Sequence, residues 1–345
     1  MLLEWMKQAV QAGASDLHLS AGRRPLMRHL GDIVPLTERL IDPQEALAMA
    51  RQVQGWLTDP EGAQDASALA QDRDGAFQRP GLGRFRVNLF QHTEGHGLVL
   101  RLIPSTLPAV DSLGLPDVVL AWLNQPQGLV LVTGPTGSGK STTLACMVQH
   151  LNAHQRLHIV TLEDPVEYVH TSDQCLIHQR EIQRDTASFA QGLRSALRQD
   201  PDILLVGELR DLPSIRWALT AAETGHLVLA TLHTRSAAQT VSRLVDGFPG
   251  EEKNLVRSQL SQSLVGVLSQ ALCKRSDGKA RVAAFEVMVA TPAVRHLIRE
   301  DKIAQLHSTL QTGGAQGMRT LAQDLARLQA QGQIPMASNA SLPVL

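Results

Sequence analysis

Polar and apolar residues alternate in two stretches near the N-terminus, residues 15–20 (SDLHLS) and residues 84–90 (RFRVNLF). A repeat of two residues is typical of strands that bury one face and expose the other. We therefore predict that residues 1–103 form an α+β domain.

Two neighbouring apolar runs, residues 84–91 and 98–103, are separated by a segment that contains Gly95 and Gly97. Glycine is favoured in the short turns of hairpins, so we predict a hairpin here. The hairpin would place Arg86 and Arg101 on neighbouring strands. From the strand pattern alone, both arginines are expected to be solvated surface charges.

Residues that interrupt regular structure cluster after residue 103, and they are Pro104, Pro108, Gly114 and Pro116. Proline fixes one backbone dihedral and removes an amide donor, so it interrupts strands and helices. We therefore predict a linker at residues 104–116, between the first domain and a second domain at residues 117–334. Residues 335–345 are predicted to form a flexible tail. The length of 345 residues also suits two domains.

Short apolar runs alternate with helical patterns in the second domain, and they lie at residues 129–133, 159–162, 203–206 and 227–232. This alternation predicts a largely parallel α/β sheet. The last third of the chain is expected to be helical, because Met318, Leu321, Leu325 and Leu328 follow the three-and-four spacing of one helix face. Gly332 is the expected stop.

The segment after the first of these runs has the composition of a phosphate-binding loop. Residues 134–141 (GPTGSGKS) match the pattern G-x-x-x-x-G-K-[ST] and precede a helical pattern. In such loops backbone amides surround the phosphates, the lysine reaches the β and γ positions, and the hydroxyl holds Mg²⁺. We therefore predict binding of ATP and Mg²⁺. The predicted nucleotide-binding residues are Gly134, Pro135, Thr136, Gly137, Ser138, Gly139, Lys140, Ser141 and Thr142.

Polar residues follow the other apolar runs. Glu163 and Asp164 follow residues 159–162, Glu208 follows residues 203–206 after one residue, and His233 follows residues 227–232. Ligands of open α/β sheets bind beyond the carboxyl ends of the strands. A carboxylate there could activate water or hold a metal, and a histidine could donate to a γ-phosphate. Taken singly, each residue could equally be a helix cap or a surface charge.

His226 and His233 lie at opposite ends of one predicted strand, about 23 Å apart at ~3.3 Å per residue. Both cannot contact one phosphate. The carboxyl end of the strand favours His233 as the phosphate contact. His226 is left for sheet packing, a subunit contact or another structural role.

Composition and charge limit which partners and which cellular compartment the sequence predicts. A net charge of −1 gives no long-range attraction for nucleic acid, so no specific nucleic-acid partner is predicted. Cys146, Cys175 and Cys273 have no spacing suited to a disulfide framework or a Cys-x-x-Cys site, which favours a reducing compartment. The apolar runs are far shorter than the ~20 residues that span a bilayer, so we expect a cytoplasmic protein.

Several ordered segments resemble the secretion ATPase superfamily that drives type II secretion and type IV pili. Residues 161–168 (TLEDPVEY) resemble its aspartate box, and residues 200–211 (DPDILLVGELRD) its atypical Walker B segment, with Gly207 before the glutamate. Residues 224–233 (TGHLVLATLH) resemble its histidine box, and residues 14–20 and 83–88 resemble its N-terminal motifs. The resemblance implies a PAS-like N-terminal domain and a RecA-like ATPase domain with C-terminal helices.

Within the superfamily, the sequence is more similar to retraction motors than to extension or secretion motors. The N-terminus is short, and three scattered cysteines cannot supply the four-cysteine zinc insertion. Residues 293–300 (AVRHLIRE) resemble the A-I-R-N-L-I-R-E helix of retraction motors. The spacing alone would fit any amphipathic helix, with Val294, Leu297 and Ile298 on its apolar face.

The resemblance also implies roles for individual residues. Glu163 matches the catalytic glutamate, Glu208 the Walker B glutamate that holds the metal with Ser141, and His233 the nucleotide-sensing histidine. Two further matches, Arg86 and Arg101, correspond to arginines that reach ATP from the N-terminal domain. One departure is Arg235, which stands where the family usually carries asparagine or threonine.

The function implied is that of an ATP-hydrolysing, homo-hexameric motor that powers pilus disassembly and twitching motility. The motor is expected in the cytoplasm, bound peripherally to the inner membrane through a pilus platform protein. A second pilus ATPase is expected as a further partner. One alternative is a low-turnover, ATP-binding regulatory or accessory subunit of a pilus or type II secretion motor. Another is a nucleic-acid transport ATPase of similar fold, which the near-neutral charge disfavours.

Overall fold

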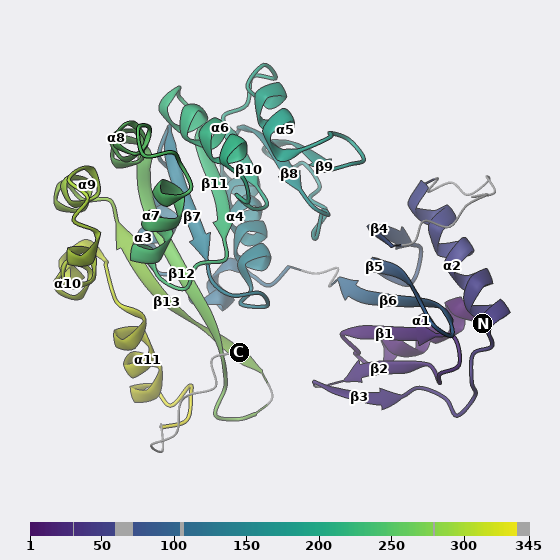
Figure 1. Ribbon diagram of the computed structural model, residues 1–345. Coiled ribbons are helices and arrows are strands. Elements are labelled where there is room, and N and C mark those ends of the chain that lie inside the picture. The colour runs from purple at the N-terminus through teal and green to yellow at the C-terminus, as the bar shows by residue number, and fades with distance from the viewer. Residues whose placement is uncertain (30, 59–71, 104–106, 279, 337–345) are drawn as a thin grey trace. The chain divides into compact units, whose positions relative to one another are not determined.

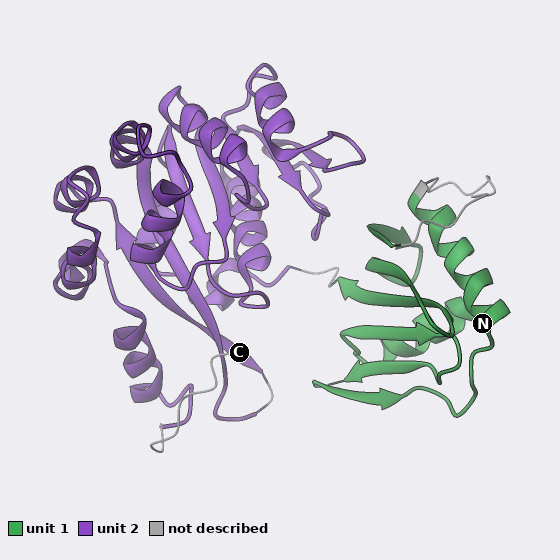
Figure 2. Cartoon of the chain, in the orientation of Figure 1, with its two compact units in different colours: residues 1–106 green, residues 107–345 purple. Residues whose placement is uncertain are grey.

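The computed structural model describes residues 1–29, 31–58, 72–103, 107–278 and 280–336. The chain divides into two compact units, residues 1–106 and residues 107–345 (Figure 2). The division falls inside the segment expected to be the linker, of which residues 104–106 lie outside the described residues. The finer limits of the linker and of the second domain stay predictions. Most of the expected tail, residues 337–345, also lies outside the described residues.

The first unit is a six-stranded antiparallel sheet with the strand order β3-β2-β1-β6-β5-β4 (Figure 1). Its elements are α1 (Leu2–Gln11), β1 (Asp16–Ser20), β2 (Leu26–His29), β3 (Asp32–Pro35), α2 (Pro43–Thr58), β4 (Arg73–Arg79), β5 (Gly83–His92) and β6 (Gly95–Ile103). Alternate residues of the central strands, among them Leu17, Leu19, Phe85 and Val87, are fully buried and form one core with both helices. The prediction of an α+β fold is confirmed.

The hairpin of β5 and β6 is confirmed as well. Its strands pair from Arg84 with Ile103 to His92 with Gly95, so the turn consists of residues 93–94 and Gly95 already belongs to β6. Arg86 lies directly opposite Arg101. Like charges in this arrangement repel each other, and Asp16, the partner of Arg101 on β1, supplies a compensating carboxylate.

The second unit contains a seven-stranded sheet with the order β13-β12-β7-β11-β10-β8-β9. The strands are β7 (Gly128–Thr133), β8 (His158–Glu163), β9 (Leu176–Glu181), β10 (Ile203–Val206), β11 (Leu227–Leu232), β12 (Leu264–Lys274) and β13 (Arg281–Val289). The pairs are parallel except for β12 with β13. The four predicted apolar runs are the strands β7, β8, β10 and β11, so the largely parallel α/β sheet is confirmed.

Helices cover both faces of this sheet (Figure 1). They are α3 (Asp117–Trp122), α4 (Lys140–His154), α5 (Phe189–Ala196), α6 (Leu212–Glu223), α7 (Ala237–Asp246), α8 (Lys253–Ser263), α9 (Pro292–Arg299), α10 (Leu306–Thr312) and α11 (Leu321–Ala330), with single 3₁₀ turns η1 (Val110–Leu113), η2 (Ile303–Gln305) and η3 (Gly314–Gln316). In β7, Leu129 and Leu131 belong to one core cluster, whereas Val130 and Val132 belong to the other. Burial on both faces explains why these strands are continuous apolar runs.

The prediction that the last third is helical is wrong for residues 264–274 and 281–289, which form β12 and β13. The run in β12 is interrupted by Ser269 and Gln270, which are polar but buried. Their burial depends on partners elsewhere in the chain, which the local pattern does not reveal. The predicted C-terminal helix begins at Leu321, after the capping box of Thr320 and Gln323, so Met318 precedes it.

The helix that resembles the retraction-motor motif is present as α9. Its predicted apolar face, Val294, Leu297 and Ile298, is buried. Arg295 extends from the same helix and donates to the carbonyl oxygens of Ala290 at 2.8 Å and Ser261 at 2.7 Å. Burial lowers the pKa of this guanidinium. The arginine thereby supplies donors to the last turn of α8, where carbonyl groups lack helical partners.

Three cysteines lie in the interior of the second unit. Cys146, Cys175 and Cys273 are free thiols and are buried. Burial raises the pKa of Cys146 to about 11 and also raises the pKa of Cys175 and Cys273. Because the thiolate is the reactive form, these thiols are held in their unreactive state.

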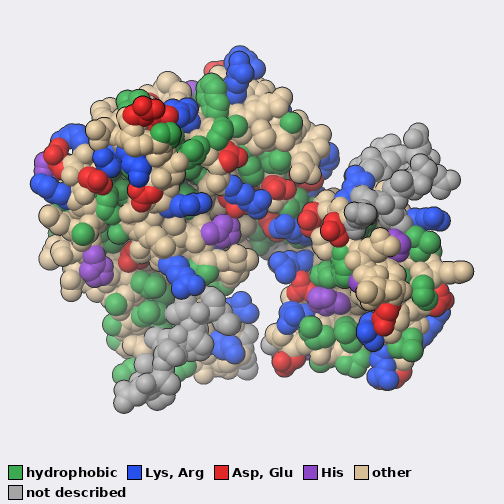
Figure 3. Space-filling view, in the orientation of Figure 1, with side chains coloured by type: hydrophobic (Ala, Val, Ile, Leu, Met, Phe, Trp, Pro, Cys, Tyr) green, Lys and Arg blue, Asp and Glu red, His purple; other side chains and the backbone are tan. Residues whose placement is uncertain are grey.

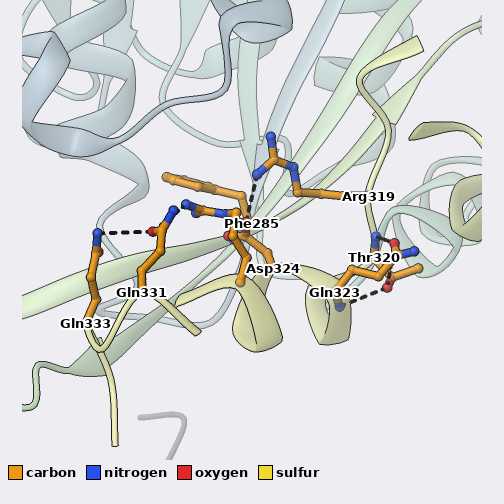
Figure 4. A network of polar contacts seen from close by, with 8 residues as sticks. Phe285, Arg319, Thr320, Gln323, Asp324, Gln331 and Gln333 are labelled. Carbon is orange, nitrogen blue, oxygen red and sulfur yellow. Dashed lines mark hydrogen bonds and ion pairs between the residues drawn. The ribbon is translucent and has the colours of Figure 1, made fainter. Parts of the chain in front are cut away.

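A buried carboxylate joins α11 to β13 (Figure 4). Oδ2 of Asp324 accepts from the amide of Phe285 at 2.8 Å, and Oδ1 accepts from Arg319 at 2.8 Å and Arg327 at 2.7 Å. Burial alone would raise the pKa of Asp324, but these three hydrogen bonds outweigh it and the pKa is lowered. Asp324 is therefore ionised in the folded protein and anchors the C-terminal helix.

We expect Asp324→Asn to destabilise the full chain by about 2 kcal/mol, because two arginines and an amide lose their shared acceptor while the arginines keep partial access to water. The measurement is the midpoint of urea unfolding at pH 7. Since the pKa is lower in the folded state, the stabilisation is complete above the unfolded value and is lost as pH falls through the folded one. The control is Asp246→Asn, which breaks an exposed pair with Lys253. An equal effect of both variants would contradict the anchoring role.

Candidate functional site

The loop between β7 and α4 has the backbone conformation of a phosphate-binding loop. Gly134, Gly137 and Gly139 have φ angles of 147°, 80° and 90°, a region that residues with a side chain rarely adopt. Lys140 is the first residue of α4. The loop therefore leads from the carboxyl end of a central parallel strand into a helix N-terminus, the arrangement that binds phosphate groups.

Lys140 lies over this loop and is almost fully buried. Its Nζ donates to the carbonyl oxygens of Gly134 at 2.9 Å and Pro135 at 3.0 Å, and it lies 3.4 Å from Nδ1 of His233. Burial lowers the pKa of Lys140, and the carboxylate of Glu208 opposes that shift. The ammonium group is thus fixed at the loop next to the end of β11.

Glu208 lies between two cationic or titratable groups. Its Oε2 is 3.2 Å from Nε2 of His233, and its Oε1 forms an ion pair with Arg210. Arg210 is also 3.8 Å from Asp164 at the end of β8, and its hydrogen bond to Glu208 raises its pKa. The His233 ring therefore connects Glu208 to Lys140, so residues predicted from three separate segments meet in one place.

Glu163 ends β8 and lies in a different environment. Its Oε1 accepts hydrogen bonds from Thr161 at 2.7 Å and from Gln179 at 3.1 Å. Burial raises the pKa of Glu163 by more than these hydrogen bonds lower it. A carboxyl group with a raised pKa and an oriented oxygen is suited to accept a proton near neutral pH.

The ends of β8 and β10 approach each other closely at Gly207. Its amide donates to the carbonyl oxygen of Leu162 at 2.7 Å. A Cβ atom at residue 207 would lie 3.2 Å from that oxygen and 3.4 Å from Cα of Glu163. The glycine before Glu208 thus allows two carboxylate-bearing strand ends to lie side by side, which gives a physical reason for this feature of the segment.

The segment after β8 is held against α4 by contacts that no sequence pattern predicted. Thr142, itself a predicted site residue, bonds the hydroxyl of Tyr168 at 3.0 Å, and Gln179 donates to the carbonyl oxygen of Tyr168 at 2.8 Å. Burial raises the pKa of Tyr168. Asn152 donates to the carbonyl oxygen of Thr171 at 2.8 Å. Gln179 and Asn152 were not singled out in the sequence, because their partners lie 11 and 19 residues away along the chain.

The predicted metal ligands are suited to Mg²⁺. Ser141 is exposed in the first turn of α4, and the carboxylate of Glu208 is oriented by Arg210 and His233. Among the described residues, no group of three or more His, Cys, Asp or Glu side chains could hold a metal ion. Mg²⁺ fits such a sparse set, because it retains water and is bound largely by substrate phosphates.

The two predicted arginines belong to the first unit. Nε of Arg101 donates to Oδ1 of Asp16 at 2.8 Å, and the arginine side chain is 60% exposed. Burial would raise the pKa of Asp16, but hydrogen bonds from Arg101 and Ser15 lower it overall. Asp16 thus bonds Arg101 through Nε and not through its two terminal nitrogens. Arg86 lies opposite on β5.

The hydrogen bond of the His226 side chain and that of the Arg235 amide are local, whereas the carbonyl oxygen of His226 accepts from the amide of Gly128 at 3.0 Å. Nδ1 of His226 lies 3.2 Å from the carbonyl oxygen of Ala221, so this histidine closes the end of α6 at the opposite edge of the sheet from His233. The amide of Arg235 donates to Gln239 at 2.9 Å. The turn after His233 is therefore held by the backbone amide of Arg235, and this hydrogen bond does not involve the arginine side chain.

Lys and Arg side chains are interspersed with Asp and Glu on the face drawn in Figure 3. On this face the described residues form no extended basic surface of the kind that tracks a nucleic-acid backbone. In the part of the chain that the structure describes, no helix combines the length and apolar character needed to cross a membrane.

Comparisons with known proteins identify relatives of this chain. A family model described as Type II/IV secretion system protein matches residues 1–336. The type IV pilus retractation ATPase PilT of Pseudomonas aeruginosa is 51% identical, covering 96% of this chain and 95% of that protein. The twitching motility protein of Neisseria gonorrhoeae is 55% identical over 76% of this chain and 70% of that protein. The crystal structure of the pilus retraction motor PilT and bound ADP has a TM-score of 0.85 at 42% identity, covering 97% of this chain and 95% of that chain.

The environment of Glu163 generates a prediction about pH. Hydrogen bonds accepted by a carboxylate favour its charged form, so their loss raises its pKa. Thr161→Val removes one of them. If Glu163 must be ionised for ATP hydrolysis, we expect the acidic limb of the pH–rate profile to move to higher pH in this variant. Thr220→Val in α6, whose hydroxyl donates to the carbonyl oxygen of Arg216, is the control. An unmoved acidic limb in Thr161→Val would show that another group titrates.

Proposed function

The chain belongs to the type II/IV secretion system protein family, and from that membership we propose that it is an ATP-hydrolysing motor that retracts a type IV pilus. One observation carries the proposal. Lys140 at the phosphate loop, His233 and Glu208 form a continuous polar chain across the carboxyl ends of β7, β11 and β10. Such a chain can respond to a γ-phosphate and to its loss. The relatives named as a pilus retraction ATPase and a twitching motility protein support the choice of the pilus as the structure on which the motor acts.

In the proposed reaction, amides of residues 134–142 and the ammonium of Lys140 bind the phosphates of ATP. Glu163 orients the attacking water and accepts its proton, for which its raised pKa is suited. His233 is proposed to contact the γ-phosphate through Nδ1, while Glu208 holds Nε2. Ser141 and Glu208 are the residues that would hold Mg²⁺, which neutralises phosphate charge when bound.

Arg86 and Arg101 are proposed to add positive charge to the phosphates from the N-terminal unit. An arginine that stabilises the charge of a phosphoryl-transfer transition state contributes roughly 10³ to 10⁵ in rate in the best-measured systems. Asp16 supports this role, because it fixes Arg101 through Nε and not through its two terminal nitrogens. Movement of the units during the cycle would then gate hydrolysis.

We propose a homo-hexameric ring as the working assembly, acting in the cytoplasm on a platform protein of the inner membrane. Rigid-body movement of the units in each subunit would withdraw pilin from the fibre base. A second pilus ATPase is a further proposed partner. The domain limits, residues 1–103, 104–116 and 117–334, are kept as part of this proposal.

The site assignment is tested by removing its chemistry. Lys140→Ala is expected to abolish ATP turnover. Glu163→Gln is expected to lower it by about 10² to 10⁴, the usual contribution of a general base. The measurement is phosphate release by the purified full chain, with folding checked by circular dichroism. Lys253→Ala and Glu223→Gln, both in surface ion pairs or hydrogen bonds of other helices, are the matched controls. Undiminished activity in either site variant would overturn the assignment.

The alternative is an accessory subunit that binds ATP and turns it over slowly. The intact set of Lys140, Glu163, Glu208 and His233 favours the motor. For the motor we expect a hexamer by light scattering at micromolar concentration with saturating Mg-ATP, together with measurable basal turnover. A strict monomer under these conditions would defeat the ring mechanism, and a ring without turnover would favour the accessory subunit.

A further inference from the structure

We propose that Gln270 of β12 is a positioning residue for the phosphate loop, whose side chain sets the loop's affinity for nucleotide phosphates. The inference rests on the proposed ATPase function and adds a residue to that site. No motif of the sequence points to this glutamine, because it lies more than a hundred residues beyond the loop.

The side chain of Gln270 contacts the loop region at two points. It is 4% exposed. Its Nε2 donates to the carbonyl oxygen of Ser138 within the loop, and its Oε1 accepts from the hydroxyl of Thr143 in the first turn of α4 at 2.9 Å. One amide group therefore bridges the loop and the helix that presents its positive end to the ligand.

The glycines of the loop pack against the same residue. A Cβ atom at Gly134 would lie 2.3 Å from the carbonyl oxygen of Gln270, and one at Gly139 would lie 2.9 Å from its Nε2. No side chain fits at the first distance, and at the second the end of the Gln270 side chain would have to move. The loop is thus seated directly on Gln270, and Gly134 is required by this contact as well as by its φ angle.

The geometry of an anion-binding loop explains why such a partner is needed. When successive amides turn inward to bind an anion, carbonyl groups are directed outward and must find donors if they are buried. Ser138 is fully buried. A glutamine amide can donate to its carbonyl group and accept from Thr143 at the same time, whereas glutamate lacks the donor and methionine lacks both.

The position of Gln270 is itself fixed by the sheet. The preceding residue, Ser269, bonds Thr133 at the end of β7 at 2.8 Å. On the other side of β12, Gln270 pairs with Phe285 of β13, and the amide of Phe285 donates to Asp324. Because β12 is held on both sides, Gln270 can impose one conformation on the loop rather than follow it.

The test uses the full chain and ADP as probe. Gln270→Met keeps the length of the side chain and removes its amide. We expect the Kd for ADP and the KM for ATP to rise about tenfold, equivalent to ~1.4 kcal/mol. The kcat at saturating ATP is expected to change less than threefold, because Gln270 does not touch the reacting atoms. The melting temperature of the nucleotide-free protein serves as the folding check, and Gln259→Met in α8 is the matched control.

Two further variants separate positioning from mere packing. Gln270→Glu keeps the shape and the acceptor but removes the donor and adds a charge, so an unchanged Kd in this variant would contradict a role for the donor facing Ser138. Thr143→Val removes only the hydroxyl. Combined with Gln270→Met, it should add little, because both changes break one shared contact. If Gln270→Met does not fold, Gln270→Glu and Thr143→Val carry the test.

The outcomes distinguish this proposal from the one on which it rests. A wild-type chain that neither binds ADP nor hydrolyses ATP would overturn both. A wild-type chain that does both, with wild-type Kd and KM in the Gln270 and Thr143 variants that fold, would overturn the positioning role and leave the proposed function intact. An equal loss of kcat and affinity would place Gln270 in the chemistry and would also contradict the proposal.

Discussion

A backbone that turns its amides toward an anion must turn carbonyl groups the other way, and the second unit is organised around that requirement. In the turn between β7 and α4, Gly134 and Pro135 share the ammonium of Lys140 as donor, while Ser138 receives the amide of Gln270. The first donor can exchange its carbonyl partners for phosphate oxygens. The second belongs to a strand and stays in place. The hydrogen bond from Gln270 to Ser138 therefore stays when a ligand binds, whereas the hydrogen bonds from Lys140 to Gly134 and Pro135 can be exchanged.

Parallel strands bring the remaining chemistry to the same edge. Because β8, β10 and β11 run in one direction, the residues at their ends face the loop that follows β7. Two carboxylates lie in different environments there. Glu208 is flanked by a guanidinium and an imidazole, whereas the pKa of Glu163 is raised by burial. The ends of β8 and β10, which carry these two carboxylates, approach each other closely at Gly207.

The parts of the structure that follow from local rules could be predicted from the sequence. Continuous apolar runs gave β7, β8, β10 and β11, and the loop was recognisable from its glycines and Lys140. The strands β12 and β13 were missed, since Ser269 and Gln270 are polar residues whose burial depends on Thr133 and Ser138 more than a hundred residues away. The hydrogen bond of Gln179 to Glu163 was missed for the same reason. Side-chain partners across a sheet carry no signal in a single sequence.

The interior location of the three thiols has a practical consequence for following the motor at work. Cys146, Cys175 and Cys273 are buried and held protonated, so maleimide reagents should pass over them in the folded chain. A cysteine introduced on an exposed helix position could then carry a fluorophore at one defined place without removal of any native residue. Pairs of such labels, one on each unit, would convert the movement between units into a change in energy transfer that can be recorded during turnover.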